Sequence, residues 1–96
     1  LTLAQASGVD PQDAVKLLGL LDLNAMVGGR GANMAKGNFA ATFELAMARK
    51  DVRLMLETAG DRPLAALPAI AVRMDQLIAQ GHGAKDASVL GIDAVR

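Results

Sequence analysis

Cysteine is absent from the 96 residues, and Phe39 and Phe43 are the only aromatic side chains. Without cysteine there is neither a disulfide framework nor a thiolate metal site. An excess of one charge is also lacking, since ten basic residues balance ten acidic ones, whereas nucleic-acid binders present a basic face. Charged residues such as Asp22, Glu44 and Arg49 interrupt the apolar runs. We therefore expect no membrane span, no signal peptide and no nucleic-acid partner.

Alanine and leucine are abundant, and both are strong helix formers. Strands favour β-branched and aromatic residues instead, so the composition predicts an all-α fold, a small domain of several helices. The length supports one domain over residues 1–96. Because no initiator Met precedes Leu1, we expect a fragment or a processed chain. Alanine buries little apolar area, so another domain or subunit is expected to complete the core. The missing cysteine does not fix the compartment, and the cytoplasm is the default expectation.

Start and stop signals divide the chain into helices. Asp10 can cap free amide groups, and Pro11 fits the first position of a helix. Thr42 is a plausible N-cap for the longest helix, which Gly60 would end. The expected helices are the end of one over 1–7, then 11–23, 42–59 and 68–81, and a short last helix from Asp86 or Ser88.

The segment 24–37 is rich in glycine, and each glycine lowers helix stability by about 1 kcal/mol relative to alanine. We predict an irregular or broken segment there, with one or two helical turns over 32–36. Gly29-Arg30-Gly31 is similar to the start of a dinucleotide-binding fingerprint, but the third glycine is missing and no strand precedes it. A flexible joint between helices is the preferred interpretation.

A charged pair lies on the longest expected helix. At 100° per residue, Met47, Lys50 and Leu54 lie within about 40° of Phe43. Lys50 is then in the middle of an apolar stripe, with Asp51 at its border. A charge in such a stripe is costly unless it is paired or hydrated. Either the stripe lines a cleft where Lys50 meets an anionic or hydroxyl-rich ligand, or Lys50 reaches past its neighbours to water.

His82 is the only histidine and lies between two glycines, where an exposed loop position is expected. Without cysteines or spaced carboxylates it makes a poor metal ligand. No Ser/His/Asp arrangement can be argued either. We predict no metal site and assign no catalytic residue.

Several short motifs occur in a fixed order along the chain. They are Gly-Val-Asp-Pro at 8–11, Asn-Met-Ala-Lys-Gly-Asn-Phe at 33–39, Phe43-Glu-Leu-Ala-Met-Ala-Arg-Lys50-Asp51, Leu67-Pro68, and Gly81-His82-Gly83 followed by Asp86. In this order they resemble the C-terminal domain of the β-hydroxyacid dehydrogenases, such as 3-hydroxyisobutyrate dehydrogenase, whose helical fold is shared with 6-phosphogluconate dehydrogenase. Asn33, Met34 and Gly37 match as framework only.

The resemblance implies a domain of an NAD(P)-dependent oxidoreductase that acts on a small β-hydroxyacid or semialdehyde. It implies that Lys50 contacts the NAD or NADP cofactor and that Phe43 and Asp51 line the substrate pocket. Its expected partners are an N-terminal Rossmann domain of the same protein and a second copy. The Rossmann domain and the helix with the family's catalytic lysine are not in this sequence, so we expect the chain alone to be inactive.

Two other interpretations stay open. One is a non-enzymatic helical interaction module whose incomplete core is covered by a protein partner. This module would not respond to nicotinamide dinucleotides. The other is a relative of the imine reductases or of the 6-phosphogluconate-type enzymes, which share the architecture and differ in substrate. The choice between NAD and NADP is normally made in the Rossmann domain and is not predicted.

Overall fold

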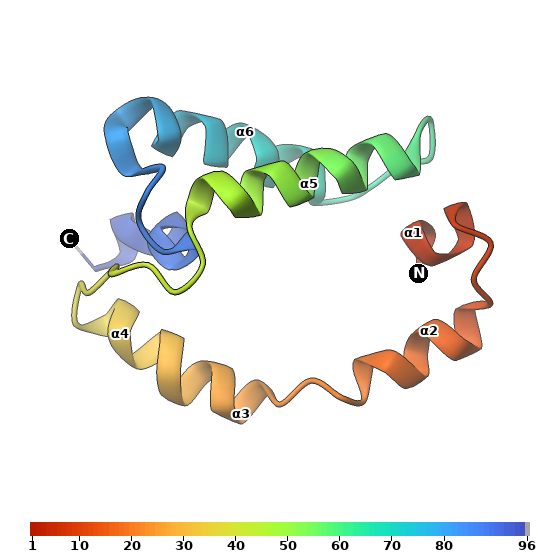
Figure 1. Cartoon of the computed structure of the whole chain (residues 1–96), viewed down its shortest axis with the longest axis horizontal. Coiled ribbons are helices and arrows are strands. Elements are labelled where there is room, and N and C mark those ends of the chain that lie inside the picture. Colours follow the sequence, from red (N-terminus) through yellow and green to blue (C-terminus); the bar gives the residue numbers. More distant parts are fainter. Residues whose placement is uncertain (96) are drawn as a thin grey trace.

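The computed structural model describes residues 1–95 (Figure 1). Within this part, extended backbone pairs only in an isolated antiparallel bridge between Glu44 and Asp86, which confirms the predicted all-α class. Two short segments, η1 and η2, are π-helical, and η3 is a 3-10 helix. The helices are α1 (Thr2–Ala6), α2 (Pro11–Leu18), α3 (Leu23–Met26), η1 (Val27–Gly31), α4 (Ala32–Ala35), α5 (Leu45–Ala59), α6 (Leu67–Leu77), η2 (Ile78–His82) and η3 (Ala87–Ala94).

The hydrophobic core lies between α5, α6 and η3, which we call the body (residues 45–94). α5 and α6 form an antiparallel hairpin, and η3 packs where α5 begins (Figure 1). Small side chains such as Ala48 and Ala71 at the contact allow the two helices to approach closely. The exposed edges of the hairpin are joined by a two-pronged ion pair between Arg49 and Asp75, with N–O distances of 2.8 and 3.0 Å. The buried core residues are Leu45, Ala48, Val52, Ala71, Met74, Leu77, Val89 and Ile92.

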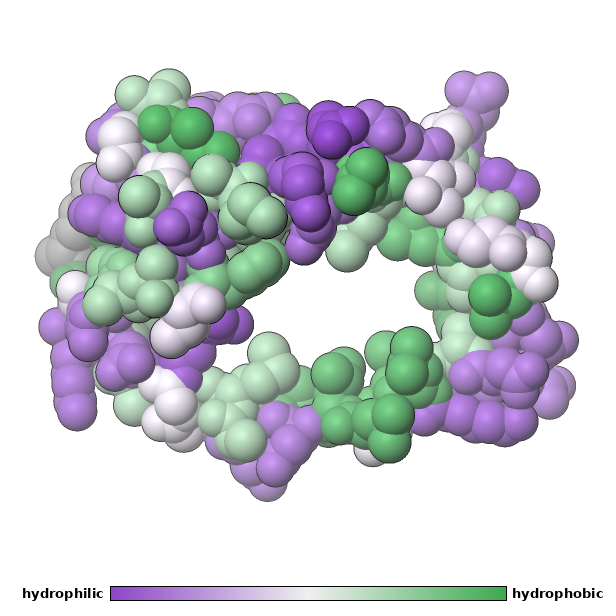
Figure 2. Space-filling view, viewed as in Figure 1, coloured by the Kyte–Doolittle hydropathy of each residue, from purple (hydrophilic) through white to green (hydrophobic). Residues whose placement is uncertain are grey.

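The N-terminal third of the chain is built differently. α2, the linker 19–22 and the continuous helical segment 23–35 form an arm (residues 11–35) that lies apart from α5 (Figure 1). None of its helices contains a buried residue. At one end the arm follows α1, which contacts α5, and at the other end α4 contacts η3. The arm, α1 and the body therefore enclose an opening, visible in space-filling view (Figure 2).

Local signals predicted several helix ends correctly. Asp10 accepts a hydrogen bond from the amide of Gln12 at 2.8 Å and caps α2. Gly60, with φ of 57°, follows the last residue of α5. Gly37, with φ of 67°, ends α4, and its amide donates to the carbonyl of Met34. A positive φ is readily adopted by glycine only, so the end of α5 at Gly60 could be predicted from the sequence.

One prediction in the arm is wrong and another is right in part. α2 ends at Leu18 rather than near residue 23, because Asp22 caps a new helix by accepting from the amide of Ala25 at 3.1 Å. The glycine-rich segment 24–37 is helical from Leu23 to Ala35 and not irregular, but its helix is broken into short pieces, and α4 confirms the turns predicted over 32–36. Its four-residue α-helices flank a π-helical segment that contains three of the glycines.

Two predictions in the body also need correction. α5 begins at Leu45, and Thr42 is not its N-cap. His82 ends η2 and is partly buried rather than exposed.

No helix among the described residues is both long enough and apolar enough to cross a membrane.

Candidate functional site

Lys50 and Asp51 lie on the solvent-accessible side of α5. The Lys50 Nζ is 2.8 Å from the Asp51 Oδ1, and the two side chains are 46% and 41% exposed. Met47 and Leu54 are exposed as well, so the predicted apolar stripe faces away from the core. The core side of α5 carries the buried residues instead. Lys50 is therefore hydrated and paired in the free chain, and it is accessible to a ligand.

Phe43 lies outside the helix on which the stripe was predicted. Because α5 begins at Leu45, the angular count from Phe43 does not apply, and the side chain belongs to the segment before the helix. The residue is 40% exposed. Its backbone amide donates to Asp86 at 3.2 Å and its carbonyl accepts from the amide of Ala87 at 2.8 Å. The structure thus joins Lys50 to Asp51 and ties Phe43 to the loop before η3.

A mainly apolar pocket of about 350 Å³ lies between α1 and α5. Asp51, Leu54, Met55 and Thr58 line it from α5. Leu3 contributes from α1, which the sequence did not indicate as part of any site. Both α1 and α5 border the opening between the arm and the body (Figure 1). Of the three predicted site residues, Asp51 alone is in this pocket.

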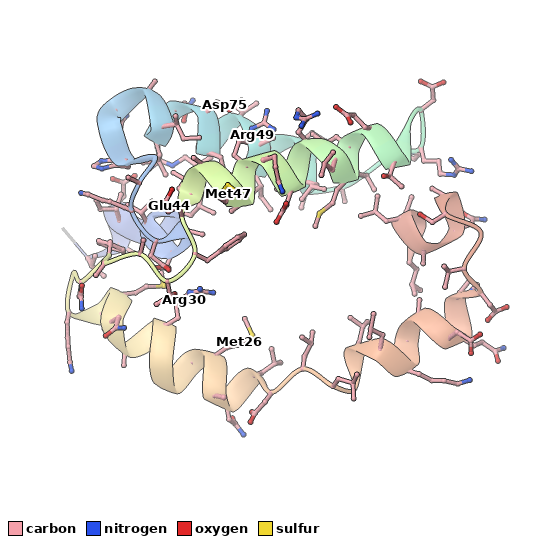
Figure 3. All side chains as sticks on the ribbon, in the orientation of Figure 1. Met26, Arg30, Glu44, Met47, Arg49 and Asp75 are labelled. Carbon is pink, nitrogen blue, oxygen red and sulfur yellow. The ribbon has the colours of Figure 1, made fainter. Side chains whose placement is uncertain are left out.

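A second pocket of about 440 Å³ lies where the arm meets the body. Arg30 lies on the side of η1 that faces the body, and Met26 lies one turn before it (Figure 3). The polar lining includes Asn33 and Asn38 beside the buried carboxylate of Asp86. The complete lining consists of Ala25, Met26, Gly29, Arg30, Asn33, Asn38, Ala40, Thr42, Asp86 and Ser88.

Asp86 is the only buried charged residue in the described part of the chain, with 4% of its surface exposed. Its Oδ2 accepts from the amide and hydroxyl of Thr42 at 3.1 and 2.9 Å and from the amide of Phe43. Its Oδ1 accepts from the amide of Ser88 at 3.0 Å and lies 3.1 Å from the Arg30 Nε. Asp86 therefore connects the arm, the segment before α5 and η3.

The carboxylate of Asp86 is held in its charged form. Burial alone would raise its pKa, but hydrogen bonds from Ser88 and Thr42 outweigh burial and lower the pKa well below that of an ordinary aspartate. Hydrogen bonds to the charged form have this effect because protonation weakens them. A group that cannot easily take up a proton is unsuited to general acid catalysis, so the geometry indicates a structural role.

The pH dependence of stability should report this role. Unfolded aspartate titrates near pH 3.9, and the folded pKa of Asp86 is lower. The contribution of Asp86 is therefore complete above the unfolded pKa and is lost as the pH falls toward the folded pKa. We expect the free energy of unfolding to decrease below about pH 5, and to decrease less in the Asp86→Asn variant. Urea unfolding between pH 3 and 7 measures both curves, and parallel curves would contradict the assignment.

The sequence indicated Asp86 only as the start of a helix and as part of the Gly-x-Gly-x-x-Asp motif. The helix-start signal is confirmed, since Asp86 caps η3 through Ser88. Its contacts with Thr42 and Arg30 span 44 and 56 positions, and no local pattern predicts such pairs. Among the described residues, no group of three or more histidine, aspartate or glutamate side chains could hold a metal ion.

No protein-family model matches this chain, and no curated protein matches it. The resemblance to the β-hydroxyacid dehydrogenases therefore depends on the motifs quoted above.

Proposed function

We propose that this chain is the helical cleft and dimerisation domain of a cytoplasmic NAD(P)-dependent oxidoreductase that acts on a small β-hydroxyacid or semialdehyde. The supporting observation is that α5 keeps Lys50, Asp51 and Leu54 accessible instead of in the core. A second domain placed on this side of α5 would contact these side chains. The motif resemblance supports the proposed reaction, and the accessible face of α5 supports the proposed position of the second domain.

In this proposal a Rossmann domain holds the dinucleotide, and the cofactor, NAD or NADP, supplies the hydride chemistry. Lys50 provides a positive charge to the cofactor, while Asp51 and Phe43 line the substrate side. An exposed ion pair contributes little stability, so an anionic ligand can replace Asp51 as the partner of Lys50 at small cost. The chain alone lacks the cofactor cradle and is expected to give no turnover.

The Lys50→Ala substitution tests this proposal in the native protein that contains the chain. The substitution removes a positive charge from the cofactor, and we expect kcat/KM with NAD(P) and a small β-hydroxyacid to fall by about tenfold or more. Lys16→Ala is the matched control, because Lys16 is exposed and pairs only with Asp13 on the outside of α2. Intact-mass analysis of the native protein comes first.

Unchanged kinetics for Lys50→Ala would remove this residue from the site. A native protein no larger than the 96 residues would contradict the proposed Rossmann partner. Activity with an imine or with a phosphorylated sugar acid, and none with β-hydroxyacids, would favour the related oxidoreductases that share the architecture.

A non-enzymatic interaction module is the second candidate. The observation that favours it is the amount of apolar surface on the arm, where Leu17, Leu20 and Leu23 are 66%, 80% and 65% exposed. Such surface in a small domain marks a protein contact. This candidate predicts a protein complex that is insensitive to NADH and NADPH. The dehydrogenase proposal predicts instead that the native protein binds NADH or NADPH.

A further inference from the structure

The chain exposes more surface than a compact protein of its mass. Its accessible area is 6469 Å², whereas a monomer of this size has about 5,200 Å². Its radius of gyration is 14.9 Å, compared with about 12.5 Å for a compact domain of the same length. The excess of about 1,300 Å² exceeds the roughly 800 Å² that one partner buries in a typical stable complex.

Apolar surface gathers around the opening. Figure 2 shows apolar side chains along the inner edge of the arm and on the α1 side. Met26 points from the arm into the opening (Figure 3), and Leu3, Leu54 and Met55 line the facing pocket between α1 and α5. The apolar arm residues that are at least half exposed are Val15, Leu17, Leu18, Leu20, Leu21, Leu23, Met26 and Val27.

The shape of the opening restricts what can fill it. Apolar walls on opposite sides require an occupant that is apolar around its circumference, and a helix with this property is stable only when buried. The molecule is 19 Å thick along the axis of view. At a rise of 1.5 Å per residue, about 13 residues of helix cross this thickness. Side chains included, a helix is about 10–12 Å wide.

A second copy of this chain does not supply such a helix. The two longest helices, α5 and α6, each carry charges along their exposed sides, including Arg49, Arg53 and Arg73. Their apolar sides already form the core of their own copy. The continuous helical segment 23–35 is long enough to cross the opening, but Asn24, Arg30 and Asn33 make its circumference partly polar. The other described helices have eight residues or fewer, which is too short. The occupant is therefore a different polypeptide segment.

We propose that the opening holds a single α-helix, apolar on all sides over about 13 residues, which completes the core of this domain. The arm and α1 close around this helix on one side and α5 on the other. Because the arm has no buried residue of its own, it can open to admit the helix and then pack on it. This inference does not depend on the dehydrogenase chemistry, and its test involves no cofactor.

A synthetic helix tests the proposal directly. The probe is a peptide with about 13 consecutive leucines and alanines, flanked by lysines for solubility. It is added to the full chain labelled with ¹³C at the methionine methyls. Met26 points into the opening from the arm (Figure 3) and Met55 lines the apolar pocket between α1 and α5, while Met74 is buried in the core and serves as the internal control. We expect the methyl resonances of Met26 and Met55 to shift together and to reach their end point at a 1:1 ratio of peptide to chain. The methyl resonance of Met74 should not shift.

Two variants and a second peptide test whether binding depends on the apolar wall of the opening and on a wholly apolar helix. Met26→Glu places a charge on the wall of the opening and is expected to weaken binding at least about tenfold. Val72→Glu is the matched control, because Val72 is equally apolar and 58% exposed but lies on α6, and it should change affinity less than twofold. A peptide with one polar face should bind much more weakly than the wholly apolar one.

Several results would overturn the proposal. One is a shift of a single methionine only, since a helix on one wall does not fill the opening. Another is a free chain whose radius of gyration in X-ray scattering is near the compact value, because the opening would then be closed. A third is dimerisation of the free chain that shifts Met26 and Met55 without peptide, which would make a second copy the occupant. Absence of any shift with peptide also contradicts it.

Discussion

The Asp86→Ala variant is expected to lose about 3–5 kcal/mol of unfolding free energy, the range for breaking a buried charge interaction. The carboxylate accepts from Thr42, Phe43 and Ser88 and pairs with Arg30. Alanine leaves these donors without their acceptor in a partly buried place, and the full desolvation cost of each then counts. Domains of this size have only about 5–15 kcal/mol in total, so the variant should melt more than about 10 °C lower.

Chemical denaturation and a thermal melt measure this effect at pH 7. Asp75→Ala is the matched control: Asp75 also pairs with an arginine, but it lies on the surface, where ion pairs contribute little. Asp86→Asn keeps the shape and should lie between the wild type and Asp86→Ala. Equal melting temperatures for Asp86→Ala and Asp75→Ala would show that Asp86 does not hold the arm and the body together.

Amide hydrogen exchange should separate the arm from the body by about three orders of magnitude or more. α2 has eight residues and no buried side chain, and isolated helices of that length are marginal in water. The amides of α5, by contrast, lie in the helix that supplies Leu45, Ala48 and Val52 to the core. Exchange in α5 therefore needs global unfolding, whereas exchange in α2 needs only local opening.

The comparison is made within one sample by exchange followed by NMR, so the body serves as the control for the arm. Segment 23–35 should be intermediate, because Arg30 ties it to Asp86 and Met34 packs beside Gly91. Equal protection in α2 and α5 would contradict the view that the arm awaits a partner. If the apolar peptide fills the opening, protection in α2 should rise.

Only some of the motifs that carry the resemblance lie where the predicted helices place them. Gly-Val-Asp-Pro forms the turn into α2, and Lys50-Asp51 lies on the accessible side of α5. Phe43 could not be placed by a helical count, because the start of α5 depends on a distant loop. The amides of Leu45 and Ala46 donate to the carbonyls of Lys85 and Gly83, and these bonds replace the side-chain cap expected from Thr42.

Local sequence signals were also insufficient to predict that the glycine-rich segment is helical. Propensity correctly counts three glycines as unfavourable for a helix between residues 27 and 31, yet the segment is helical. The cap at Asp22 starts it, and the Arg30 contacts with Asp86 and Thr42 hold it against the body. Tertiary contacts outweigh a local cost of this size, and single-sequence patterns contain no information on them.

The sequence by itself determined the all-α class, the cap at Asp10 and the glycine end of α5. These features depend on residues within one or two turns of each other, so their physics is local. Only the tertiary structure decided where α5 begins, that the glycine segment is helical, that Asp86 connects three parts of the chain, and that the arm leaves an apolar opening. Each of these results from contacts between residues far apart in the sequence, whose energies exceed local preferences.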